Sequence, residues 1–156
     1  MPKVRGDRIL DAPPDAVWRT VGDPRHLARW WPKVQRVEGV EGAHFTEVLQ
    51  TDRGRAIRAD WTISESVAPQ RLTCRQDVEG TPFESVLQAA SREITLQPAG
   101  EGDTAVTVTI ERRMRGVSRL SGFMLRRATT RQLEAALDNL VLLHGEARVG
   151  GAEEAS

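Results

Sequence analysis

Apolar and polar residues alternate along most of the chain, from about Lys33 to Arg115. A period of two is typical of strands with one buried face, and the alternation breaks at short segments rich in glycine or proline. These breaks define six predicted strands, near residues 33–39, 44–51, 55–65, 71–79, 84–97 and 104–115. Because the connections are short, we expect an antiparallel meander.

The chain opens with a strand-like run near Val4 to Asp11, followed by the segment "APPDAVW". Proline has the backbone angle of a first helical turn, so this segment predicts a helix from about Pro14 to Val21. Asp23 then supplies an N-cap for a second short helix, which begins at Pro24 and ends before Pro32.

The last predicted element has the periodicity of a helix and extends from Ser118 to about Arg148. At 1.5 Å per residue it would be roughly 40 Å long, enough to cross a whole sheet. A seven-stranded antiparallel sheet has one face that must be covered, and only this helix is long enough to cover it. The pattern predicts one α+β domain over residues 1–148, with a disordered tail at 149–156.

Composition narrows the range of functions. Basic and acidic residues number 22 each, so no overall charge favours a nucleic-acid partner. The single cysteine excludes an intrachain disulfide, and three scattered histidines lack the spacing of a zinc site, so we expect neither metal nor cofactor. The sequence contains no secretory signal and no apolar stretch long enough to span a membrane, which predicts a cytoplasmic protein.

The segments "APPDAVW" and "DPRHLARWWP", the six-strand meander and the long last helix resemble the START-like, or helix-grip, superfamily. The resemblance covers about Val4 to Ala147 and is to the bacterial polyketide cyclase/dehydrase and lipid-transport branch. It implies a seven-stranded curved sheet, with two short helices and the last helix enclosing a cavity. The superfamily includes cyclases, lipid carriers, hormone receptors and chaperone activators, so the fold does not settle the activity.

Polar side chains occur in the strand rows predicted to face inward. The candidate ligand-binding residues in these rows are Trp61, Gln88, Arg92, Arg112 and Met114. The expected turns place Cys74 opposite Gln88, Arg92 opposite Ile110, and Ala90 opposite Arg112.

An unpaired guanidinium in a dry core would cost many kcal/mol, so something must satisfy these arginines. We hypothesise a wet pocket in which Gln88, Arg92 and Arg112 orient an oxygen-bearing group, such as a carboxylate, phenolate or enol. Two alternatives remain open. A β-bulge could turn an arginine outward, or each arginine could pair with an interior carboxylate such as Glu47.

Three of the four tryptophans lie within fourteen residues. Trp18 shares a helix stripe with Val17 and Val21, so we interpret it as a core residue. Trp30 and Trp31 close the second short helix, where one ring can fill the end of a cavity while the other caps the outside. The resemblance implies that these helices form part of the cavity wall, and Trp30 is the candidate that lines it.

The segment from Arg112 to Arg131 contains seven arginines and no acidic residue. Apolar residues between them make it amphipathic, and Met124 and Arg127 complete the candidate ligand-binding residues. Such a segment is typical of weak contact with an anionic membrane, although a solvated arginine-rich face is the interpretation that the sequence favours. Without an exposed aromatic platform, it does not favour nucleic acid.

The sequence therefore favours a protein that binds a hydrophobic small molecule, lipid- or polyketide-like, beneath the last helix. The alternatives are a polyketide cyclase or aromatase and a lipid carrier at a membrane surface. No proton-transfer group stands out, because a lone histidine on an apolar stripe such as His144 is typical of a packed core. A cyclase could still act by enclosing its substrate while an arginine stabilises an enolate. The oligomeric state does not follow from the sequence.

Overall fold

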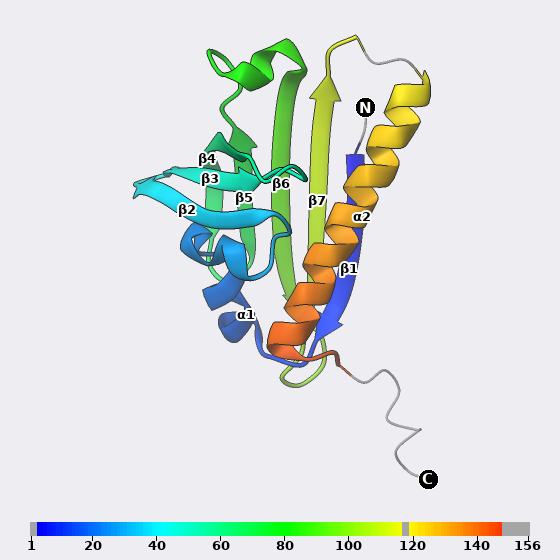
Figure 1. Cartoon of the computed structure of the whole chain (residues 1–156). Coiled ribbons are helices and arrows are strands. Elements are labelled where there is room, and N and C mark those ends of the chain that lie inside the picture. Colours follow the sequence, from blue (N-terminus) through cyan, green and yellow to red (C-terminus); the bar gives the residue numbers. More distant parts are fainter. Residues whose placement is uncertain (1–2, 117–118, 148–156) are drawn as a thin grey trace.

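The computed structural model describes residues 3–116 and 119–147, in which seven strands form one antiparallel sheet (Figure 1). The spatial order is β1-β7-β6-β5-β4-β3-β2, so the predicted meander is confirmed, with β1 added beside β7. The strands are β1 (Lys3–Leu10), β2 (Val34–Glu41), β3 (His44–Gln50), β4 (Ala56–Val67), β5 (Arg71–Gln76), β6 (Leu87–Pro98) and β7 (Thr104–Met114). The predicted disordered tail lies outside the described residues.

The helical elements are α1 (Pro14–Val21), the short 3₁₀ helices η1 (Pro24–Arg29) and η2 (Pro82–Ser85), and the long α2 (Arg119–His144). Asp23 caps η1 as predicted, since its side chain accepts a hydrogen bond from the backbone N–H of Arg25 at 3.0 Å. The alternation of the sequence did not predict η2, which takes the place of the first residues of the strand expected from residue 84.

The sheet is strongly curved, and α2 lies along its β1 and β7 side (Figure 1). At the other side β2 and β3 run at a steep angle to β6 and β7, with α1 and η1 beside them (Figure 1). Sheet and helices therefore surround a common interior. Among the described residues, no helix has the length and apolar character that crossing a bilayer requires.

The C-terminal half of α2 packs tightly on the sheet. Leu133, Leu137 and Leu140 are each at most 1% exposed. A Cβ atom on Gly6 of β1 would lie 2.8 Å from a methyl carbon of Leu137, so the missing side chain allows this close approach. This half of the interface is a dry aliphatic core.

The elements after β1 are fixed to the rest of the molecule by aromatic residues. Trp18 packs against the core, as expected, and its ring lies where a Cβ on Gly22 would be, at 2.4 Å. Asn139 of α2 donates a hydrogen bond from Nδ2 to the backbone oxygen of Trp30 at 3.0 Å. These contacts hold the end of η1, and with it Trp31, against the interior.

Candidate ligand-binding cavity

A cavity of about 270 Å³ lies between the concave face of the sheet and the N-terminal half of α2. Strands β3 to β7 contribute most of its wall, while α2, η2 and Trp31 contribute the rest. The lining residues are Trp31, Glu47, Leu49, Ala59, Trp61, Gln76, Phe83, Val86, Leu87, Arg92, Arg112, Met114, Leu125 and Gln132. Apolar and aromatic groups with a few polar ones are typical of small-molecule sites.

Arg92 is the central polar residue of the cavity, and it is 6% exposed. Its Nη1 donates to Oε2 of Glu47 at 2.8 Å, across the strands between β6 and β3. The guanidinium carbon also lies 4.0 Å from the ring centre of Trp31 and 4.5 Å from that of Trp61. Cation–π contacts on two sides and one carboxylate hold the guanidinium in a fixed place.

Three nitrogen donors around this cavity have no hydrogen-bond partner among the described residues. They are Nε1 of Trp61, Nε2 of Gln76 and Nε of Arg92, all with less than 1 Å² of exposed surface. Buried polar atoms in native proteins are nearly always paired, and an unpaired one is costly. All three residues line one cavity, so a molecule held there would lie close to these N–H groups, which a small shift of the side chains would expose to its acceptor.

Arg112 ties the sheet to α2 at the edge of the cavity. Its Nη1 donates to Oγ1 of Thr129 at 3.1 Å, and its Nη2 donates to Oε1 of Gln132 at 2.8 Å. Burial lowers the pKa of Arg112, the positive charge of Arg92 lowers it further, and Glu47 raises it. Thr129 and Gln132 are neutral, so they leave the positive charge of Arg112 free to attract an anionic group.

Cys74 of β5 pairs with Arg92 of β6 and is 3% exposed. Burial raises the pKa of its thiol to about 11, while Arg92 lowers it and Glu47 raises it. A neutral buried thiol is a poor nucleophile, so Cys74 acts here as a small packing residue. The described residues contain no group of three or more histidine, cysteine or acidic side chains that could hold a metal ion.

Four of the predicted site residues line the cavity: Trp61, Arg92, Arg112 and Met114. The predicted register between β6 and β7 is confirmed, because Arg92 pairs with Ile110 and Ala90 pairs with Arg112. Of the alternatives left open, pairing with Glu47 is confirmed for Arg92.

The prediction that Gln88 faces inward is wrong, since this residue is exposed. The register shifts between Leu87 and Ala89, so a β-bulge reverses the alternation at this point. Leu87 faces the interior instead and is 7% exposed. The register between β5 and β6 also differs from the predicted one, because Cys74 pairs with Arg92 rather than with Gln88.

The prediction that Trp30 lines the ligand space is wrong, because Trp31 occupies that place. Both rings are buried, at 0% and 3% exposure, and they pack edge to face with centres 5.2 Å apart. Neither ring caps the outside. The backbone after η1 turns the second ring, rather than the first, toward Arg92.

Met124 and Arg127 lie away from the cavity, with Met124 63% exposed and Arg127 also exposed. Helical geometry explains this difference. Leu125, Thr129 and Gln132 follow one another at intervals of four and three residues and share the face toward the sheet, whereas the predicted pair lies off that face. Leu125 and Gln132 line the cavity in their place.

Sequence reasoning gave no ligand-binding role to Trp31, Glu47, Gln76, Leu125 or Gln132. Glu47 had a usable signal, because it lies between Phe45 and Leu49 on the inward row of an alternating strand. A charged residue at such a position is a candidate for function. The polar residues of α2 carried no comparable signal, since their direction depends on how the helix is rotated over the sheet.

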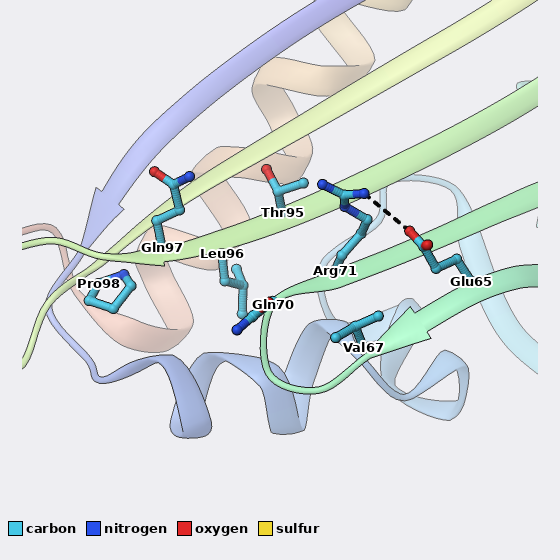
Figure 2. A pocket seen from close by; sticks show the side chains of 8 residues that line it. All are labelled: Glu65, Val67, Gln70, Arg71, Thr95, Leu96, Gln97 and Pro98. Carbon is cyan, nitrogen blue, oxygen red and sulfur yellow. Dashed lines mark hydrogen bonds and ion pairs between the residues drawn. The ribbon is translucent and has the colours of Figure 1, made fainter.

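A further hollow, of about 670 Å³, lies at the turn between β4 and β5 and near the end of β6 (Figure 2). Arg71 Nη1 lies 3.3 Å from Glu65 Oε1 there, and both side chains are about half exposed. None of the residues lining this groove lines the inner cavity. Its lining is mainly polar, whereas small-molecule sites are lined mainly by apolar groups.

Comparison with known proteins agrees with this geometry. The sequence pattern of the family described as polyketide cyclase / dehydrase and lipid transport matches residues 1–144. The structure is similar to that of the protein XoxI from Bacillus cereus, with a TM-score of 0.74 at 15% identity over 92% of this chain and 96% of that one. A START superfamily protein from Mycobacterium smegmatis gives a TM-score of 0.70 at 12% identity, covering 90% of this chain and 97% of that one.

The di-domain ARO/CYC BexL from the BE-7585A biosynthetic pathway is also similar, with a TM-score of 0.73 at 22% identity. The match covers 90% of this chain but 45% of BexL, so this chain corresponds to about one of its two domains. A comparison with curated proteins finds no match. At these identities the solved structures show the helix-grip fold and nothing finer.

Proposed function

Because this chain belongs to the polyketide cyclase/dehydrase and lipid transport family, we propose that it binds a hydrophobic small molecule in the inner cavity. The molecule is lipid- or polyketide-like and presents an oxygen acceptor to Trp61, Gln76 and Arg92. The observation that carries this proposal is the set of three unpaired N–H donors around one cavity. We place this function in the cytoplasm, which stays a prediction from the sequence.

The size of the cavity restricts the ligand. At about 270 Å³ it has the volume of about nine water molecules, at roughly 30 Å³ each, and lies at the small end of ligand pockets. A fused pair of aromatic rings suits such a space, whereas a lipid with two acyl chains does not. The site therefore favours a compact ligand, or the compact end of a longer one.

A matched pair of ligands tests the acceptor. 2-Acetonaphthone and 2-ethylnaphthalene have nearly the same shape, but only the first carries a carbonyl oxygen. We expect calorimetric titration to show about tenfold tighter binding of the ketone, the effect of one well-made hydrogen bond to a buried donor. Equal affinity for both ligands would refute recognition of an oxygen acceptor.

The variant Trp61→Phe keeps an aromatic ring beside Arg92 but removes one N–H donor, so the preference for the ketone should shrink. Trp30→Phe is its matched control, because Nε1 of Trp30 is also buried and unpaired but does not line the cavity. That variant should retain the full preference. If the two variants behave alike, the loss comes from packing and not from the donor.

A cyclase activity is the second candidate, and the position of Glu47 supports it. Its carboxylate lines the cavity at 2% exposure, beside the donors of Arg92 and Trp61. In such a reaction Glu47 would take a proton from the carbon between two carbonyls, and the N–H groups would stabilise the enolate oxygen. The similarity to an ARO/CYC protein is in keeping with this chemistry.

The cyclase candidate is tested with a linear aromatic triketone and absorbance detection of its cyclised product. The native protein should accelerate cyclisation above the rate in buffer, and Trp61→Phe should reduce the acceleration. If the protein binds 2-acetonaphthone but does not accelerate cyclisation of the triketone, it is a binding protein and the cyclase candidate is excluded. Glu47→Gln is informative only if its unfolding curve shows that it is folded.

Transfer of a ligand at a membrane surface is a third candidate, favoured by the outer face of α2. Phe123 and Met124 are each 63% exposed, and the neighbouring Arg126 and Arg127 are also exposed. Apolar and cationic groups together suit an anionic bilayer. Co-sedimentation with phosphatidylserine vesicles should decrease with salt and in Phe123→Ser, and an absence of salt-sensitive binding would exclude this candidate.

A further inference from the structure

A third hollow, of about 600 Å³, lies outside the cavity wall beside the middle of α2, and we call it the outer hollow. Its lining residues are Pro32, Lys33, Asp52, Arg112, Ala128, Arg131, Gln132 and Ala135. Arg112 and Gln132 line both this hollow and the inner cavity. The hydrogen bond between these two side chains, at 2.8 Å, therefore forms part of the partition between the two spaces.

Positive charge dominates the outer hollow. Lys33, Arg112 and Arg131 face a single carboxylate, that of Asp52, and Lys33 Nζ lies 2.9 Å from its Oδ1. Arg112 binds only neutral groups of α2, and Arg131 has no hydrogen bond or ion pair among the described residues. Two guanidiniums without a carboxylate within ion-pair distance thus border one space, which suits a bound anion.

The backbone at Lys33 is a second, independent observation. Lys33 has φ +68°, a conformation that residues other than glycine and asparagine rarely adopt. Its carbonyl accepts a hydrogen bond from the backbone N–H of Gln50 at 2.9 Å, and its side chain reaches Asp52. Such backbone outliers persist where the surroundings enforce them and are frequent at ligand sites. Lys33 lines the outer hollow, so its conformation also indicates a ligand site there.

We infer that the outer hollow is a second subsite, which binds a carboxylate or phosphate group of the same molecule whose apolar end occupies the inner cavity. This inference rests on the proposed function. A ligand longer than the inner cavity would displace the hydrogen bond between Arg112 and Gln132, and its anionic end would then meet Lys33 and Arg131. The ligand class is an aryl or acyl ketone with a flexible chain that ends in an anion.

The experiment compares three probes with the same apolar end, a 2-naphthoyl group joined to a chain of about six methylene groups. One chain ends in a carboxylate, one in its methyl ester and one in a phosphate monoester. We expect the native protein to bind both anions at least about tenfold more tightly than the ester, with a preference that falls as salt is added. If the phosphate probe binds much more tightly than the carboxylate probe, the natural ligand carries a phosphate headgroup. The reverse order identifies the natural ligand as a free carboxylic acid.

Two separate variants test the residues. Arg131→Gln removes the unpaired guanidinium, and Lys33→Asn removes a charge while keeping a residue that tolerates a positive φ. Each should reduce the preference for the anion over the ester by about threefold to tenfold. Arg126→Gln is the matched control, because this arginine lies on the same helix but does not line the outer hollow, and it should retain the preference.

The outcomes separate this inference from the proposed function. If 2-acetonaphthone binds but acid and ester have equal affinity for the native protein, the outer subsite is refuted and the inner cavity stands. The subsite is also refuted if Arg126→Gln reduces the preference as much as Arg131→Gln does, since the effect is then only that of overall charge. If 2-acetonaphthone itself does not bind, the proposed function fails, and this inference fails with it.

Discussion

The two halves of α2 cover the same sheet in different ways. The C-terminal half contacts it through leucines that are at most 1% exposed and approaches β1 where Gly6 leaves room. The N-terminal half meets it through Arg112, which spans the gap to Thr129 and Gln132. At one end a long polar side chain on the strand joins the sheet to the helix by hydrogen bonds, whereas at the other end a glycine lets the helix approach closely.

The residues of the strands thus decide where the interior is dry and where it is hollow. At the hollow end, small side chains such as Ala59 and Cys74 lie on the strands between Glu47 and Arg92. They leave room for the buried ion pair and for the cavity beside it. The comparison predicts that charge governs stability at one end of the interface and apolar packing at the other.

The largest effect is expected from Glu47→Leu, which leaves the charge of Arg92 buried without its carboxylate. Breaking a buried pair on one side typically costs about 3–5 kcal/mol of the free energy of unfolding. Urea denaturation measures this loss. Glu38→Leu is the control, because Glu38 forms exposed pairs with Arg36 and Arg58, which solvent screens, so its loss should change stability little.

A double variant tests whether charge is the cause. Combining Glu47→Leu with Arg92→Met removes both charges and leaves two apolar side chains, which commonly restores most of the stability lost in the single variant. If Glu47→Leu alone is no less stable than Glu38→Leu, the two groups do not form a dry pair, and the cavity end is solvated.

At the dry end, Leu137→Ala should reduce the free energy of unfolding by about 2–5 kcal/mol, because it creates a void in a packed core. Leu125→Ala, at the cavity end, only enlarges an existing space and should cost roughly half as much or less. Leu142→Ala is the exposed control, since this leucine is 83% exposed and its loss should change stability by about 0.5 kcal/mol or less. Equal losses for Leu137 and Leu125 would contradict the difference between the two halves.

The same contrast explains what the sequence could predict. The strands, α1, and the pairing of Ala90 with Arg112 follow from local alternation, proline positions and turn lengths, which are properties of short segments. The position of Gln88 does not, because the bulge after Leu87 leaves no mark in the alternation. The predicted inward direction of Arg92 is nevertheless correct, because β6 is regular from Ala90 onward.

The residues that α2 and η1 contribute to the cavity depend on how separate elements dock. Choosing Leu125 over Met124 requires the rotation of the helix about its axis, and a shift of one residue turns a side chain by about 100°. Choosing Trp31 over Trp30 requires the backbone path after η1. Both depend on packing between elements far apart in the sequence, which periodicity within one element does not record.

The thiol of Cys74 offers a pH test at the cavity end. Its pKa is raised from about 9 to about 11 by burial, so the folded state keeps the proton that the unfolded state loses. Stability from this group is therefore complete below about pH 9 and is lost as the pH rises toward 11, by roughly 2 to 3 kcal/mol. The chain has no tyrosine and only two lysines, so few other side chains titrate in this window.

Urea midpoints between pH 8 and 11 measure this slope in the native protein and in Cys74→Ala. The variant is less stable at pH 8 because a packing atom is lost, but its stability should change less with pH. Parallel curves for the two proteins would show that the thiol of the folded state ionises as readily as that of the unfolded state.

The smallest effect is expected at the C-terminal end of α2, where burial lowers the pKa of His144. Its Nε2 lies 2.9 Å from Oγ1 of Thr20 on α1, a neutral group that does not favour the charged ring. The unfolded state therefore binds the proton more readily, and stability present above about pH 6.5 is lost as the pH falls below that value. NMR titration should give a midpoint for this ring below about 6.5, and His144→Gln should flatten the stability profile between pH 5 and 7. A midpoint above 6.5 would require a carboxylate near the ring, and the dry end of the interface would then also depend on charge.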